Sequence, residues 1–140
     1  MAYQRHSVTL DLDTDVTHDC FLHHTRDNHL IGILEFHKPT EQLTWGDIEY
    51  FRRRSDEFSV MPFPDCINAI IIDIRQVSAV IDHEIPIITW RLIEEDCPIR
   101  LVVPFDRIEH YAGLFEPTWL SSDVESCIAE LREFMDMFVH

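Results

Sequence analysis

The sequence predicts an α/β fold: a mixed β-sheet with an N-terminal β-hairpin, followed by βαβαβα units whose helices pack on one or both faces of the sheet. Segments His18–His24 and His29–Phe36 flank the short polar connection Thr25–Asn28, as in a β-hairpin. Ile67–Ile74 is apolar and β-branched without alternation, which is typical of a central strand buried on both faces. Amphipathic segments alternate with the later strands, and right-handed crossovers make such strands parallel.

The elements before the central strand follow from alternation and capping. Ser7–Leu12 alternates apolar and polar residues and predicts an opening strand within an acidic N-terminal segment, residues 1–17. A first helix is expected to begin near Thr44, because Thr44 and Asp47 have the spacing of a capping pair. Met61–Pro64 ends this helix, since proline cannot continue the hydrogen-bond ladder.

A helix and a strand are expected directly after the central strand. Asp82–Asp96 predicts the helix, with Pro86 in its first turn, where a missing N–H is tolerated. Ile99–Val103 predicts the strand, which Pro104 stops. Because a helix connects it to the central strand, this strand should lie parallel to it.

The last part of the chain predicts two helices around a short edge strand. Asp106 and Glu109 are spaced as a capping pair in front of a short amphipathic helix. Pro117–Leu120 is a candidate for the edge strand, and Ser122 with Glu125 is expected to cap the final helix. One face of that helix carries the apolar residues Val124, Cys127, Ile128, Leu131, Phe134, Met135 and Phe138.

Composition limits the classes of function. The chain has 140 residues and a formal net charge of −15, and this length predicts a single domain over residues 1–140. A chain this acidic is repelled by phosphate backbones and anionic lipid, so neither nucleic acid nor a membrane is an expected partner. It has no apolar span, no signal peptide and no C-x-x-C pair among its four cysteines, so we expect a cytoplasmic protein with reduced thiols.

The apolar run Ala69–Val77 and the following apolar segment Ile99–Val103 resemble two successive strands of one known family. They are similar to the central strand and the next strand of the STAS family, the fold of bacterial anti-sigma-factor antagonists. Phe115, then Trp119 and Ser122–Leu131, match its closing pattern of a short strand, a Ser/Asp cap and a helix rich in Ala and Leu. The resemblance covers roughly Leu30–Leu131 and implies a regulatory domain that acts by binding another protein.

In the STAS family the loop into the second helix carries Asp-Ser, often followed by Ser-Gly-Leu-Gly, and a kinase phosphorylates the serine. The corresponding stretch here, Val80–Pro86, has Asp82 but no hydroxyl and no glycine. Ser78 lies upstream, in the turn after the strand. Asp82 and Glu84 would either imitate a phosphorylated state permanently or cap the helix, whose N-terminus favours an anion.

Together these features favour a non-catalytic regulatory module that binds a regulator, a kinase-like protein or a second copy of the chain. The expected partner-binding loop comprises Val77, Ser78, Asp82, His83 and Glu84. No G-x-S-x-G, P-loop or G-x-G-x-x-G motif is present, so neither an enzyme nor a cofactor is expected. The alternatives are a carrier of a small apolar ligand, held between sheet and helices, and a metal-dependent enzyme that uses the hairpin histidines.

The histidines of the hairpin are the candidate metal ligands. With a four-residue connection, His24 would face His29 and His18 would face Glu35 across the strands. His24, His29 and Asp27 could then bind a divalent metal. The other interpretation is a solvated edge that changes charge near neutral pH.

Three tryptophans, Trp45, Trp90 and Trp119, are candidate surface anchors for a partner. For Trp90 the alternative is a helix buried on two sides. The basic run Arg52–Arg54 spans most of a helix circumference and has acidic neighbours, so it is expected to be a solvated face.

Overall fold

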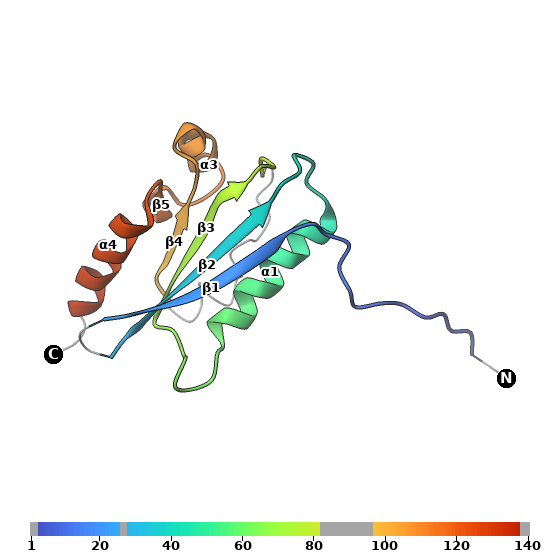
Figure 1. The fold of residues 1–140 in the computed structure, drawn as a ribbon, viewed down its shortest axis with the longest axis horizontal. Helices are drawn as coiled ribbons and strands as arrows, with labels where there is room; N and C mark the ends of the chain where they lie inside the picture. Colours follow the sequence, from blue (N-terminus) through green and yellow to red (C-terminus); the bar gives the residue numbers. More distant parts are fainter. Residues whose placement is uncertain (1–2, 26–27, 82–96, 138–140) are drawn as a thin grey trace.

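The computed structural model describes residues 3–25, 28–81 and 97–137, which form an α/β structure around a five-stranded mixed sheet (Figure 1). The strands lie in the order in which they occur in the chain. They are β1 (Thr17–His24), β2 (Leu30–Lys38), β3 (Ala69–Val77), β4 (Ile99–Val102) and β5 (Leu120–Ser121). The helices are α1 (Trp45–Ser59), α3 (Ile108–Ala112) and α4 (Val124–Asp136), with 3-10 turns at Phe105–Arg107 and Pro117–Trp119. None of these helices is long and apolar enough to cross a membrane.

The predicted hairpin and the predicted parallel pairing are both confirmed. β1 pairs antiparallel with β2, and β2, β3, β4 and β5 pair parallel in sequence. β3 is the third of five strands, and its residues Ala69–Ile74 are all buried. The short edge strand expected over Pro117–Leu120 is confirmed only at Leu120: Pro117–Trp119 is a 3-10 turn, and β5 consists of Leu120–Ser121.

The register of the hairpin differs from the expectation by one residue. His24 pairs with Leu30 rather than with His29, and His18 pairs with Phe36 rather than with Glu35. The connection is longer than four residues, and Asn28 within it has a positive φ of 62°. A shift of one residue moves every side chain to the other face of the sheet, so His24 and His29 do not face each other across the strands.

The prediction of an opening strand over Ser7–Leu12 is wrong. Residues 3–16 carry no strand, and the first strand begins at Thr17. In Figure 1 the N-terminal segment runs away from the sheet as an extended chain. A strand needs a neighbour for its backbone hydrogen bonds, and the described part of the chain supplies none beside residues 7–12.

The capping pair that opens α1 is confirmed. The Asp47 N–H donates to Thr44 Oγ1 at 3.2 Å, and the Thr44 N–H donates to Asp47 Oδ2 at 2.9 Å. The helix ends at Ser59, before the proline-containing turn, as predicted. Gly46, in its first turn, is close to the N-terminal segment: an added Cβ would lie 2.0 Å from the carbonyl oxygen of Asp13.

The two later caps differ from the prediction. No side chain caps the 3-10 turn Phe105–Arg107 or α3, so Asp106 does not cap a helix. The cap of α4 is Asp123, not Ser122, because its carboxylate accepts hydrogen bonds from two backbone N–H groups of the first turn. The helix expected over 82–96 lies outside the described residues.

Helices cover both faces of the sheet. Alternate side chains of β3 enter two separate apolar clusters. Ile72 packs in the cluster that contains Phe51 of α1, whereas Ile71 packs in the cluster that contains Leu131 of α4. The α3 residue Tyr111 belongs to the first cluster, so α1 and α3 share one face and α4 lies on the other.

Candidate functional site

A pocket lies at the carboxyl ends of β3 and β4, the edge of an α/β sheet where ligands commonly bind. It has a volume of about 310 Å³. It is lined by Glu41, Arg75, Gln76, Val77, Ser78, Pro104, Asp106 and Arg107. The parallel strands place this pocket here, because the chain leaves each of them at the same edge and enters a loop or a helix.

Two of the five residues expected in the partner-binding loop line this pocket. Val77 is buried at the end of β3, and Ser78 is exposed next to it. The Ser78 N–H donates to the Lys38 carbonyl oxygen at 3.0 Å, and the Ser78 carbonyl oxygen accepts from Arg107 Nη1 at 3.5 Å. Asp82, His83 and Glu84, the other three, lie outside the described residues.

The chain beyond Ser78 is held against α3. Ala79 and Ile81 are buried in the core. The Ile81 N–H donates to the Tyr111 hydroxyl at 3.2 Å, and the Ile81 carbonyl oxygen lies 3.0 Å from His110 Nε2. Ser78 therefore lies on a segment that is fixed on both sides, by β3 and by these contacts.

Two guanidinium groups, those of Arg75 and Arg107, line the pocket together with carboxylates. Arg75 Nη2 lies 2.8 Å from Asp73 Oδ2, and Arg75 Nε lies 3.0 Å from Asp73 Oδ1. This hydrogen-bonded pair raises the pKa of Arg75 further above its ordinary value, although burial acts in the opposite direction. Arg107 lines the pocket from the adjoining 3-10 turn, and carboxylates of Glu41 and Asp106 balance the charge. Such a pocket can hold a polar or charged group of a partner through hydrogen bonds.

Exposed aromatic side chains lie at the same end of the sheet. Trp45, the first residue of α1, is 78% exposed, and Phe105, the first residue after Pro104, is 80% exposed. Trp45 lines a second hollow of about 510 Å³ that shares Glu41 with the first. Trp45 is thus on the surface as expected; Trp119 is partly buried against the core, and Trp90 lies outside the described residues.

A buried charged network lies beside these hollows. Lys38, at the end of β2, is only 2% exposed. Its ammonium contacts the carboxylate of Asp15, lies 2.9 Å from Asp47 Oδ2 and 2.8 Å from Thr40 Oγ1. Burial lowers the pKa of Lys38, but the hydrogen bonds to Asp15 and Asp47 outweigh it and the pKa is raised. The network fastens the N-terminal segment to the start of α1.

Sequence reasoning missed this network. The available signal is alternation: Lys38 continues the series Leu34 and Phe36, both completely buried, on one face of β2. A lysine at that position needs a partner charge, because an unpaired buried ammonium is costly.

The described residues hold one group that could ligate a metal ion: Asp19, Glu35 and His37, whose ligand atoms lie within 4.8 Å of one another. His37 Nε2 lies 3.1 Å from both Asp19 Oδ2 and Glu35 Oε1. The group offers three protein ligands for a divalent cation and leaves open positions for water. A protonated His37 would instead bridge the two carboxylates.

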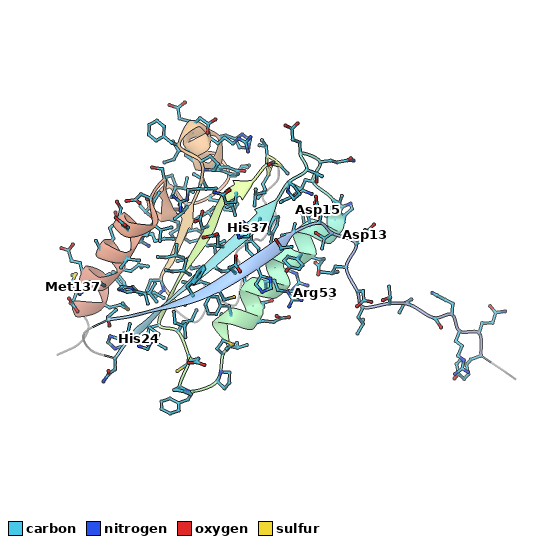
Figure 2. All side chains as sticks on the ribbon, viewed as in Figure 1. Asp13, Asp15, His24, His37, Arg53 and Met137 are labelled. Atoms are coloured by element: carbon cyan, nitrogen blue, oxygen red, sulfur yellow. The ribbon has the colours of Figure 1, made fainter. Side chains whose placement is uncertain are left out.

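This group is not the one expected from the sequence. In Figure 2, His37 and His24 lie near opposite ends of the hairpin. His24 is exposed at the last position of β1, and Asp27 lies outside the described residues. The difference follows from the register, which sets Asp19 opposite Glu35 instead of His18.

Comparison with known proteins found no relative of this chain. No family model, no curated protein and no solved structure matches the chain.

Proposed function

We propose that this chain is a non-catalytic regulatory module that binds a protein partner through the carboxyl end of its sheet. The observation that carries the proposal is the pair of exposed aromatic side chains, Trp45 and Phe105, at the same edge as the pocket around Ser78. Large exposed aromatic side chains are unfavourable in water, and aromatic and arginine residues dominate binding energy at protein interfaces.

The groups at the carboxyl end of the sheet indicate which side chains a partner would need. Trp45 and Phe105 would be covered by apolar side chains of the partner, while Arg75 and Arg107 would hydrogen-bond a carboxylate or another anionic group between them. A regulator or a kinase-like protein with an acidic side chain beside an apolar patch fits this description. Because the strands and the contacts of Ile81 fix the backbone here, little conformational entropy would be lost on binding.

Kinship with the STAS family is part of the proposal. The mixed sheet, with Ala69–Ile74 at its centre and a loop leaving its carboxyl end, supports it. A cytoplasmic location is also part of it and is supported by the four cysteines, all of which are free thiols.

Partner capture with point variants tests the interface. The purified chain is used as bait in extract of its native cell, and bound proteins are quantified by mass spectrometry. Trp45→Ala and Phe105→Ala should each reduce recovery of the same partner by about tenfold or more, the loss typical of a central interface residue. Phe63→Ala is the matched control, because Phe63 is equally exposed but lies in the turn between α1 and β3, at the other end of the sheet.

If wild type, Trp45→Ala and Phe105→Ala recovered equal amounts of the partner, this proposal would be wrong. A loss caused by Phe63→Ala alone would move the interface to the opposite end of the molecule.

A small-ligand carrier is the second candidate, favoured by the hollow beside Trp45. Its volume of about 510 Å³ falls in the range of ligand sites, and Leu43, Ile48 and Val80 give it apolar walls. Native mass spectrometry of freshly purified protein separates the two candidates. A carrier would keep a bound small molecule whose mass disappears in Ile48→Trp, a substitution that fills the hollow.

A further inference from the structure

The N-terminal arm, defined here as residues 3–12, exposes apolar side chains in a regular pattern. Val8 is 77% exposed and Leu10 is 83% exposed, while Leu12 is half-buried. These residues occur at every second position, the spacing that puts side chains on one side of a β-strand. The arm thus has the alternating sequence of a strand and runs as an extended chain in Figure 1, but it pairs with no described strand.

The base of the arm is fixed to the body of the protein. Val16 is buried in the core, and Asp15 contacts the ammonium of Lys38. The Asp13 carbonyl oxygen lies against Gly46, where a side chain would collide with it. Figure 2 shows Asp13 and Asp15 beside the start of α1, with the arm continuing outward. These contacts direct the arm away from the outer edge of its own β1.

The sheet offers a matching unpaired edge. Among the described strands, β1 pairs with β2 alone, so the backbone groups on its outer side have no strand partner. β1 is eight residues long and contains no proline, and Phe21 in its middle is half exposed. An edge of this kind accepts an added strand through main-chain hydrogen bonds.

We propose that the arm of one copy pairs as a β-strand with the outer edge of β1 of a second copy, and that the second copy reciprocates. The arm leads directly into β1, so a two-fold axis that sets one arm against the other copy's β1 also sets the second arm against the first β1. The contact closes on itself as an antiparallel pair, which yields a dimer and not a filament. Val8 and Leu10 leave water in this arrangement. The inference does not depend on the partner proposed above, which binds at the carboxyl end of the sheet and not along the side of β1.

The oligomeric state tests the arm exchange. Wild type should sediment as a dimer at about 100 μM and dissociate on dilution, as a contact of moderate affinity does. The double variant Val8→Asp with Leu10→Asp should weaken dimerisation about 100-fold or more, because it removes both newly buried apolar side chains. Thr9→Asp is the matched control: it adds a charge on the other side of the same strand and should stay within a few-fold of wild type.

Cross-linking tests which surfaces meet. The variant Thr9→Cys with Cys66→Ser and Cys97→Ser leaves Cys20, which is exposed on β1, as the second accessible thiol, because Cys127 is buried. In a mixture of isotope-labelled and unlabelled chains, a short bis-maleimide should join position 9 of one copy to Cys20 of another.

The proposal is overturned by a monomeric wild type at about 100 μM, by dimers that persist in the Val8→Asp, Leu10→Asp variant, or by links confined to single chains. A monomer whose arm is instead captured by a different protein would also overturn it. Because the arm buries little in one copy, the variants should keep the far-UV circular dichroism of wild type.

Discussion

The buried ion pair of Lys38 and Asp47 is the clearest case of a single residue whose role depends on its neighbours. Asp47 accepts a hydrogen bond from Thr14 at 2.6 Å and from the Thr44 backbone at 2.9 Å, in addition to Lys38. Each charge is satisfied by groups from a different part of the chain. The pair therefore joins the N-terminal segment, the end of β2 and the start of α1.

Removing the ammonium should destabilise the fold strongly. Lys38→Met keeps the volume but leaves the Asp47 carboxylate buried without its counter-charge, and we expect a loss of about 3 kcal/mol in the free energy of unfolding. Urea denaturation measures it. Arg52→Met is the control, since Arg52 pairs with Glu49 at the surface, where ion pairs contribute at most about 1 kcal/mol. Similar losses in the two variants would show that Lys38 is not buried as described.

Asp47 should make the fold sensitive to acid. Burial raises the pKa of Asp47, but hydrogen bonds from Thr14 and Lys38 outweigh it, so the pKa lies below its ordinary value of 3.8. The ionised form is favoured more in the folded than in the unfolded chain. Its contribution is therefore complete above the unfolded pKa and is lost as the pH falls through the lower, folded pKa.

The change in urea midpoint between pH 6 and pH 3 measures this contribution. It should be smaller in Asp47→Asn than in wild type, although the variant is less stable at pH 6. Asp65→Asn, which alters an exposed carboxylate in the turn before β3, should follow the wild-type profile. If the urea midpoint changed equally with pH in wild type and in Asp47→Asn, Asp47 would not be the carboxylate whose ionisation stabilises the fold.

At the scale of elements, the start of a helix was predictable where the capping residues lie within a few positions of each other in the sequence. The Thr44 and Asp47 pair needs only three residues of spacing to be recognised, and it is confirmed. For α4 the prediction chose Ser122, one residue early, because serine and aspartate are equally good caps and stand side by side. Backbone conformation decides between them: Asp123 is extended, with φ −143° and ψ 125°, and its carboxylate reaches the first turn.

Substitution at the two adjacent positions separates the caps. Asp123→Ala should lower the Tm by about 3 °C, because two backbone N–H groups of α4 lose their acceptor. Ser122→Ala should change the Tm by about 1 °C or less. Differential scanning calorimetry measures both Tm values. A larger loss in Ser122→Ala than in Asp123→Ala would show that Ser122 caps the helix.

At the scale of the whole molecule, the sheet divides the chain into a body and an arm. The body is held by two apolar clusters on opposite faces of β3. The arm shares almost none of that burial, whereas Val16 and Asp15, which follow it, are tied into the body.

Two truncations should therefore differ sharply. Removal of residues 1–12 should leave the free energy of unfolding within about 0.5 kcal/mol at protein concentrations where copies are dissociated. Removal of residues 1–16 should cost at least about 2 kcal/mol, because it also deletes the buried Val16 side chain. Urea titrations at low protein concentration compare the two, and equal stability would contradict the boundary between arm and body.

The candidate site was only partly predictable. The position of Ser78, at the turn leaving the central strand, followed from the apolar run before it, and the structure has Ser78 in the pocket there. Phe105 and Arg107 were not anticipated, because the turn after β4 reaches this end of the sheet only once β3 and β4 pair; Arg75, on β3 itself, was not singled out as a pocket residue. The group of Asp19, Glu35 and His37 was missed for the related reason that it depends on the hairpin register.

The sequence by itself determined the α/β class, the hairpin, the central strand and the start of α1, because periodicity and capping act over a few neighbouring residues. Only the tertiary structure decided the pairing register, the burial of Lys38 and the unpaired state of Ser7–Leu12. Each of these depends on groups far apart in the chain: a strand exists only beside a partner, and a charge can be buried only where an opposite charge meets it.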